Sequence, residues 1–327
     1  MREPYFWSVT DKRSRAASPM SKLLLTPLSM AYRWAGERRI RTTVPEDVGI
    51  PVVCIGNLTL GGAGKTPITE AVRAYFSAKG LRAASLSRGY RGSLEGAHRV
   101  DPVRQTASEV GDEPLMLSAL GESWISKDRL AGARAMKADG VQVIVMDDGH
   151  QNPALKKSLS IVVMDASNPV GNGHVFPKGP LREPAATGLA RADAVVLMGD
   201  GMQPTLLDGF ARPILRARLV PLAPLPPGRY VAFAGIARPA RFFDALQKQP
   251  GVELSEGAPY PDHHMFTPHD LKFLTKLAGE RDARLVTTDK DHVRLPEDMK
   301  ANVLRASVRA QFDDEPAFAA LLGRVTA

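Results

Sequence analysis

A short stretch near the start of the chain has the composition of a phosphate-binding loop. Residues 59–66 have the sequence TLGGAGKT. In such a loop small residues let backbone N–H groups surround phosphate oxygens, a lysine reaches the outer phosphates, and the final hydroxyl can bind Mg²⁺. The residues expected to contact the phosphates are Thr59, Leu60, Gly61, Gly62, Ala63, Gly64, Lys65 and Thr66.

The loop departs from the usual Walker A pattern GxxxxGK[ST] at one position. Thr59 stands where the first glycine is expected, whereas Gly64, Lys65 and Thr66 complete the pattern. The alternative is a glycine-rich turn before an ordinary helix. Because the loop follows an apolar run and precedes a helical stretch, we favour the phosphate-binding interpretation.

Two adjacent carboxylates, Asp147 and Asp148, follow directly after the apolar run at residues 141–146. A strand that ends in a carboxylate beside a phosphate loop is the Walker B arrangement, in which Asp binds Mg²⁺ directly or through water. Thr66, Asp147 and Asp148 are therefore the candidate metal ligands. The same carboxylates also suit a turn or a helix cap, and that alternative stays open.

The expected cofactors are ATP and Mg²⁺. A GTPase would normally also contain a guanine-reading N-K-x-D motif, whereas residues 287–291 have the sequence TTDKD, in the wrong order. These features predict a P-loop nucleotide enzyme or switch, with ATP preferred over GTP.

The elements that must position these residues follow from the apolar pattern. Short β-rich runs alternate with helical stretches from residue 50 onward. We expect strands at 50–56, 81–86, 141–146, 159–164 and 194–198, and helices at 67–78, 114–120 and 128–138. Continuous apolar strands alternating with helices predict an α/β fold: a P-loop NTPase core whose mostly parallel sheet is covered on both faces.

A second, smaller α/β set follows a proline-rich connector at residues 220–228. Its expected strands are 230–234, 285–288 and 303–306, and its expected helices are 240–248 and 268–277. The predicted division is a basic N-terminal segment (1–45), a P-loop core (46–220) and a smaller C-terminal α/β domain (221–327).

The charge of the chain is concentrated at its start. The 327 residues include 43 Lys and Arg against 35 Asp and Glu, a net charge of +8. Nine of the basic and three of the acidic residues lie within 1–45, so this segment carries most of the excess. Positive charge suits nucleic acid, an anionic membrane or a phosphorylated substrate. The single cysteine, Cys54, excludes an internal disulfide framework and suits a buried strand position in a cytosolic protein.

The N-terminal segment has an amphipathic pattern. Ser18-Pro19 and Thr26-Pro27 each resemble a helix start,. On a helix, Lys22, Thr26, Ser29 and Arg33 share one polar stripe. The apolar stretch is too short to span a bilayer, so we expect the segment to lie on an anionic membrane surface. The alternative is a helix that docks on its own domain. Neither nucleic acid nor an obligate protein partner is expected.

The chain resembles the tetraacyldisaccharide 4′-kinase (lipid A 4′-kinase) family. The matching strings follow the order of that family over nearly the whole chain. They are FW (6–7), LTPLS (25–29), GNLT (56–59) leading into GGAGKTP, SRGY (87–90), GDEP (111–114), DR (128–129), DDGHQ (147–151), GPLRE (179–183), AGIARP (234–239), DHH (262–264) and TTDKD (287–291). Thr59 fits the loop of this family, whereas Ala63 and Asp289 are mild departures from it.

The resemblance implies ATP-dependent phosphorylation of the 4′-hydroxyl of tetraacyldisaccharide 1-phosphate, which forms lipid IVA. It implies a peripheral enzyme on the cytoplasmic face of the inner membrane, and a small C-terminal domain that closes over the site and is joined by a two-stranded link. It also implies that Asp112 is the catalytic base, with His263 as its partner and Lys65 on the phosphates. Arg88 and Arg182 are candidates for contacts with phosphate.

Each of these roles has an alternative. Asp112 also suits a helix N-cap, and Arg88 and Arg182 also suit structural ion pairs. The two histidines also suit a surface loop, or a metal site with Asp262, His269 and Asp270, and His264 competes with His263. The alternative functions are a membrane-associated nucleotide switch and a P-loop kinase for a soluble sugar or nucleoside.

Overall fold

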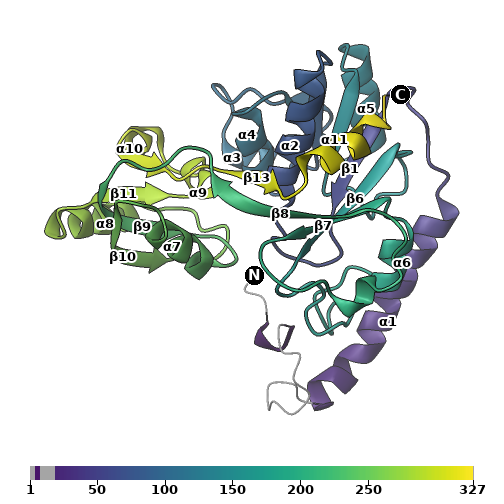
Figure 1. Ribbon diagram of the computed structural model, residues 1–327, viewed down its shortest axis with the longest axis horizontal. Coiled ribbons are helices and arrows are strands. Elements are labelled where there is room, and N and C mark those ends of the chain that lie inside the picture. The colour runs from purple at the N-terminus through teal and green to yellow at the C-terminus, as the bar shows by residue number, and fades with distance from the viewer. Residues whose placement is uncertain (1–3, 8–18, 327) are drawn as a thin grey trace.

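The computed structural model describes residues 4–7 and 19–326, which form two sheets of unequal size (Figure 1). The larger sheet has the strand order β13-β8-β7-β6-β1-β5-β2-β4-β3. Its strands are β1 (Val52–Gly56), β2 (Ala83–Ser87), β3 (His98–Arg99), β4 (Ser123–Ile125), β5 (Val143–Asp147), β6 (Leu159–Asp165), β7 (Ala194–Met198), β8 (Ile214–Pro221) and β13 (Val308–Phe312). The strands from β8 to β4 pair in parallel, and the two edge strands pair antiparallel. The predicted mostly parallel α/β sheet is confirmed.

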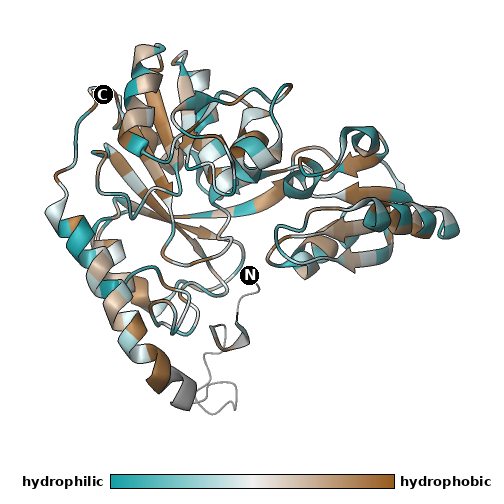
Figure 2. Cartoon of the chain, turned by 180° about the vertical axis from the view of Figure 1, so that it is seen from behind, coloured by the Kyte–Doolittle hydropathy of each residue, from teal (hydrophilic) through white to brown (hydrophobic). Residues whose placement is uncertain are grey.

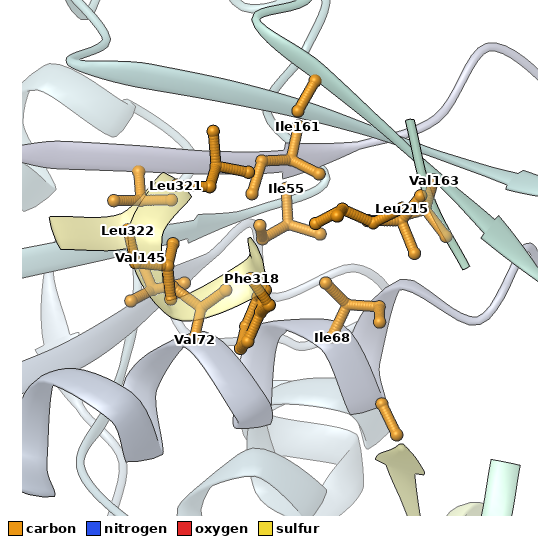
Figure 3. Close-up of a cluster of buried hydrophobic side chains, with 14 of the residues drawn as sticks. Ile55, Ile68, Val72, Val145, Ile161, Val163, Leu215, Phe318, Leu321 and Leu322 are labelled. Carbon is orange, nitrogen blue, oxygen red and sulfur yellow. The ribbon is translucent and has the colours of Figure 1, made fainter. Parts of the chain in front are cut away.

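Helices cover both faces of this sheet because its central strands bury side chains on both sides. Helices α2 (Lys65–Ala78) and α11 (Glu315–Gly323) cover one face, and α5 (Arg129–Ala138) and α6 (Ala185–Ala190) cover the other. Figure 3 shows Ile68 of α2 and Phe318 of α11 below Ile55 of β1. Cys54 of the same strand faces α5 and is fully buried, as an apolar residue would be. We call the sheet and these helices the core lobe.

The remaining helices of the core lobe lie next to β2 and β4. They are the short helices α3 (Ala107–Val110) and α4 (Asp112–Ser118). Their buried residues Ala107, Val110 and Leu115 pack with Ile125 of β4. This packing holds the first turn of α4 at the edge of the core lobe that faces the smaller sheet (Figure 1).

The smaller sheet is parallel, with strand order β10-β9-β11-β12. Its elements are β9 (Gly228–Ala234), α7 (Pro239–Gln247), β10 (Val252–Pro259), α8 (Pro268–Glu280), β11 (Arg284–Thr287), α9 (Asp289–His292), α10 (Glu297–Lys300) and β12 (Val303–Arg305). Helix α7 packs on one face through Leu246, and α8 packs on the other through Leu274. We call residues 228–306 the small lobe.

Strands β8 and β13 lead from the core lobe to the small lobe and back (Figure 1). They pair antiparallel from Pro221 with Val308 to Ala217 with Phe312. After β13 the chain packs onto the core lobe again, where Phe318 and Leu322 of α11 are buried. The structure therefore departs from the expected C-terminal division at 221–327, because residues 308–326 bury their apolar side chains in the larger core.

The N-terminal helix α1 (Pro19–Thr42) is continuous. The predicted helix start at Thr26-Pro27 is wrong, since Pro27 lies inside the helix. A proline removes one backbone hydrogen bond, but contacts on both sides of it hold the helix in place. Lys178 Nζ donates to Thr26 Oγ1 over 3.1 Å, and Ser29 Oγ donates to the carbonyl of Val175 over 2.7 Å. The other predicted start, at Ser18, lies outside the described residues.

Within the described residues, no helix has the length and apolarity needed to cross a membrane. The other short elements are the 3-10 turns η1 (Tyr5–Trp7) and η3 (Thr205–Leu207). Trp7 of η1 is buried, and its ring meets Phe176 edge to face, with centroids 5.9 Å apart. Tyr32 of α1 contacts the same phenylalanine ring. These aromatic contacts attach the N-terminal elements to the core lobe.

Candidate active site

The predicted phosphate loop connects β1 to the first turn of α2. Gly64 occupies the N-cap with a left-handed φ of 80°, and a Cβ there would lie 3.2 Å from Met198 Cε. Glycine is therefore needed at this position. Gly64 has no side chain that could accept a hydrogen bond from the first N–H groups of α2. These N–H groups therefore remain available to bind an anion. Gly62 has open space around its Cα.

Hydrogen bonds from neighbouring segments set the shape of the loop. The backbone N–H of Leu60 donates to Pro180 O over 2.7 Å, and Thr59 forms a bridge with Leu181. Asn57 Nδ2 donates to Gly61 O over 3.3 Å. Ala63 is buried in the core. The loop is therefore held by contacts at Thr59, Leu60, Gly61 and Ala63.

The two adjacent carboxylates lie beside this loop. Strands β5 and β1 pair in parallel with Asp147 opposite Ile55, so Asp147 ends its strand next to the start of the loop. Thr69 Oγ1 of α2 donates to Asp147 Oδ1 over 3.1 Å. Burial raises the pKa of the Asp147 carboxyl, and the charge of Glu113 raises it further.

Asp148 is surrounded by cations. Its Oδ1 lies 3.5 Å from Lys65 Nζ, and its Oδ2 accepts from Arg182 Nη1 over 3.0 Å. Burial raises the pKa of Asp148, but these two charges outweigh burial and lower the pKa to about 2. Asp148 is therefore a carboxylate at any physiological pH.

The donor atoms in this region fit Mg²⁺. Asp148 Oδ1 is buried and has no hydrogen-bond partner among the described residues, so it has a free lone pair. The described residues contain no cluster of three or more His, Cys, Asp or Glu side chains that could hold a metal ion. Among the described residues, Asp262, His269 and Asp270 therefore form no such cluster with the two histidines. Mg²⁺ commonly takes one or two carboxylates and completes its shell with water and substrate phosphates, and Asp147, Asp148 and the Thr66 hydroxyl fit that mode.

Asp112 lies at the first turn of α4 and contacts the small lobe. The N-cap of α4 is Gly111 rather than Asp112, so the helix-cap alternative does not hold. His263 Nδ1 lies 2.7 Å from Asp112 Oδ2, and Arg294 Nε lies 3.3 Å from the same oxygen. Burial raises the pKa of Asp112, but the His263 hydrogen bond and the Arg294 charge outweigh it and lower the pKa.

The two neighbouring histidines have different environments. His264 Nε2 lies 3.0 Å from Asp270 Oδ2, at the N-terminus of α8, and its ring lies 4.7 Å from that of Tyr260, tilted by 31°. His263 has a left-handed φ of 60°, which turns its side chain toward the core lobe and Asp112. Of the two, His263 is the one that contacts Asp112.

The two arginines proposed for phosphate contacts are placed differently. Arg182 reaches both the loop, where its Nε donates to Thr59 O over 3.1 Å, and Asp148. It therefore also forms the ion pair considered as its alternative role. Arg88 follows β2, is exposed, and forms no hydrogen bond or ion pair with any described residue.

The sequence did not identify three residues that take part in contacts between the lobes. Lys290 Nζ lies 3.2 Å from His263 Nε2, and the buried guanidinium of Arg294 reaches Asp112. At a separate contact between the lobes, Asp165 at the end of β6 accepts from Arg241 Nη1 of α7 over 2.9 Å. The only available signal for Lys290 was the TTDKD string, which we considered for guanine recognition and as a match to the family, but not as a source of site residues.

A parallel sheet with a phosphate loop after β1 and a carboxylate pair at the end of β5 defines a P-loop NTPase,. A family model for tetraacyldisaccharide-1-P 4′-kinase matches residues 21–327. The chain belongs to this family.

Relatives agree with this assignment. The chain is 55% identical to the tetraacyldisaccharide 4′-kinase of Hyphomonas neptunium, over 99% of this chain and 98% of the relative. It is 49% identical to the enzyme of that name from Maricaulis maris, over 98% and 96%. Among solved structures, LpxK from Aquifex aeolicus in complex with ATP superposes with a TM-score of 0.75 at 24% identity, covering 94% of this chain and 100% of that one. That likeness shows the same fold.

Proposed function

We propose that this protein transfers the γ-phosphoryl group of ATP to the 4′-hydroxyl of tetraacyldisaccharide 1-phosphate, the reaction for which its relatives are named. The observation that carries the proposal is the contact of Asp112 with His263, which joins the two lobes at the first turn of α4. A hydroxyl acceptor needs a base aligned with it, and a carboxylate held in this way meets that need.

The loop and the carboxylate pair bind and orient the nucleotide. The N–H groups at residues 59–66 surround the phosphates, and Lys65 offsets their charge. Thr66, Asp147 and Asp148 would hold Mg²⁺, which when bound neutralises charge on the phosphate oxygens. Arg182 keeps Asp148 in place and presents its fork to phosphate, and exposed Arg88 is available for the phosphate of the acceptor,.

Asp112 accepts the proton of the attacking hydroxyl. His263 donates from Nδ1 to one carboxylate oxygen, Oδ2, which leaves Oδ1 for the substrate. The small lobe supplies His263 and Arg294 and thereby acts as a lid, because the base is fully surrounded only when the lobes are in contact. This arrangement is the reason to assign phosphoryl transfer rather than nucleotide switching alone.

The direct test is to find where the phosphate goes. The full chain is incubated with γ-labelled ATP, Mg²⁺ and detergent-dispersed tetraacyldisaccharide 1-phosphate, and lipid, water-soluble sugar and inorganic phosphate fractions are counted. We expect label in the lipid fraction. Label found only as inorganic phosphate would support a nucleotide switch, and label on an added soluble sugar or nucleoside would support the other alternative.

We further infer that α1 places the enzyme on the anionic surface of the cytoplasmic face of the inner membrane. The polar side of α1 faces the core lobe, where Ser29 is buried. The opposite side exposes a continuous apolar face, and Leu23 and Leu24 each have 74% of their surface accessible. Figure 2 shows this hydrophobic stretch near the start of the helix. The face comprises Leu23, Leu24, Leu28, Met30 and Trp34.

This arrangement supports the membrane-surface interpretation over docking on the protein itself, because a helix that docked to bury its apolar side would not leave it exposed. Exposed Arg38 and Arg41 follow the apolar face toward the end of the helix, where they can meet lipid phosphates,.

The double variant Leu24→Asp/Leu28→Asp should bind vesicles containing phosphatidylglycerol on the order of 100-fold more weakly than the wild type. Each buried leucine contributes about 1.5–3 kcal/mol, or roughly tenfold or more in partitioning. Vesicle co-sedimentation measures this. The control is Val103→Asp/Met202→Asp, which alters two apolar residues outside α1 that are even more exposed than Leu24 and Leu28. Equal loss in both variants, or none in the first, would show that α1 is not the membrane contact.

A further inference from the structure

Lys290 lies directly behind His263 as seen from Asp112. Its Nζ is 3.2 Å from His263 Nε2, and the other ring nitrogen, Nδ1, is 2.7 Å from Asp112 Oδ2. Carboxylate, imidazole and ammonium thus form one continuous chain across the two lobes. All three side chains are largely buried: 13% of the Asp112 side chain, 18% of His263 and 23% of Lys290 is accessible.

The donor and acceptor capacities of these groups allow one arrangement of protons. An ammonium has three donors and no acceptor, so Nε2 of His263 must accept. A neutral imidazole has a single N–H, which then lies on Nδ1 and is donated to the Asp112 carboxylate. The opposite tautomer would direct an N–H at the ammonium and a lone pair at the carboxylate, and both contacts would be repulsive.

We propose that Lys290 is a positioning residue that holds His263 in the Nδ1–H tautomer, so that the imidazole donates to Asp112 and does not take its proton. The inference rests on the proposed role of Asp112 as base. Because Nδ1 already carries a proton and Nε2 faces an ammonium, the imidazole has no free site for a second proton. The proton removed from the acceptor hydroxyl therefore stays on Asp112.

The small lobe holds Lys290 and His263 in a fixed relation. Arg294, whose side chain is fully buried, donates from Nε to Lys290 O over 2.9 Å and from Nη1 to His264 O over 3.0 Å. The same guanidinium is thus hydrogen-bonded both to α9, which carries Lys290, and to the loop that carries His263. The carboxylates of Asp262 and Glu113 lie 3.7 and 4.0 Å from Lys290 Nζ and balance its charge.

Close packing at Gly235 keeps the histidine loop in its strained conformation. The backbone N–H of His263 donates to Gly235 O over 3.0 Å. A Cβ at Gly235 would lie 3.0 Å from Pro261 O and 3.1 Å from Asp291 Oδ1. The left-handed φ of His263 therefore occurs in a loop that is hydrogen-bonded to and tightly packed against Gly235, as expected for a residue whose orientation matters.

The test is the variant Lys290→Met, which keeps the length of the side chain and removes the donor. Full-length protein labelled with ¹⁵N-histidine contains seven histidines, and the His263 signals are assigned by comparison with His263→Gln. In the wild type we expect a protonated Nδ1 and an unprotonated Nε2. In Lys290→Met we expect the Nε2 signal to move toward the protonated form, and kcat to fall about 10- to 100-fold with little change in KM for ATP, as for other residues that orient an imidazole.

Two further variants separate positioning from a general structural role. Lys290→Arg retains a donor and should restore part of both the ¹⁵N pattern and kcat. Lys276→Met removes an exposed lysine of α8, paired with Glu280, and should change neither. An unchanged ¹⁵N pattern in Lys290→Met would overturn the inference, whether or not kcat falls. If instead the wild type labels no lipid, the proposed function fails, while the ¹⁵N pattern still reports on Lys290.

Discussion

The variant Asp112→Asn should turn over about 10²- to 10⁴-fold more slowly than the wild type, which is the range that a positioned general base contributes. The amide keeps the size of the side chain but cannot take the proton of the acceptor hydroxyl. ATP binding should stay nearly unchanged, since Asp112 is not among the groups assigned to the nucleotide phosphates. Single-turnover kinetics with labelled ATP measure the first effect, and equilibrium nucleotide binding measures the second.

The pH profile gives an independent check on Asp112. Its pKa is lowered because His263 and Arg294 outweigh the effect of burial. A lowered pKa keeps the base ionised as pH falls, so the acid limb of kcat/KM that this group sets should lie below the usual aspartate value of about 4. The matched control is Asp208→Asn, at an exposed aspartate of the core lobe. Near-normal turnover by Asp112→Asn would remove Asp112 from the mechanism.

The second large effect is expected at the phosphate loop. Lys65→Met should lower kcat/KM by about 10²- to 10³-fold, the loss seen when one charge-stabilising group is removed from a reacting centre. The ammonium is nearly buried, with 10% of its side chain accessible, and therefore acts on the phosphates with little screening by water,. Unlike Asp112→Asn, this variant should also bind ATP more weakly.

Lys79→Met is the control for this change. Lys79 is the exposed C-cap residue of α2, at the opposite end of this helix from Lys65, and its ammonium lies over the Tyr75 ring. It should retain wild-type kinetics. If Lys65→Met also kept wild-type turnover, the loop would be a structural turn, which was the alternative that the missing first glycine left open.

The elements that sequence patterns predicted well are those with continuous apolar runs. The five expected core strands occur as β1, β2, β5, β6 and β7 within two residues at each end. Strand β10 was not predicted. It has the sequence VELSEGAP and lies half-buried at the edge of the small sheet, so its pattern lacks an apolar run. Strand β8 (ILRARLVP) and the edge strand β13 (VRAQF) were missed for the same reason.

Local patterns also failed where tertiary contacts opposed them. Thr26-Pro27 has the pattern of a helix start, but α1 continues through it because Ser29 and Thr26 contact the segment that contains Val175 and Lys178. Similarly, the chain after β13 returns to the core lobe, since Phe318, Leu321 and Leu322 are buried there.

The sequence by itself determined the phosphate loop, the carboxylate pair after a buried strand and the α/β core, because each depends on residues that are neighbours along the chain. Only the tertiary structure decided that His263 rather than His264 meets Asp112, and that Lys290 and Arg294 join them. Asp112 and His263 are separated by 151 positions. Such a contact depends on how the β8–β13 link places the small lobe against α4, and no local periodicity records that placement.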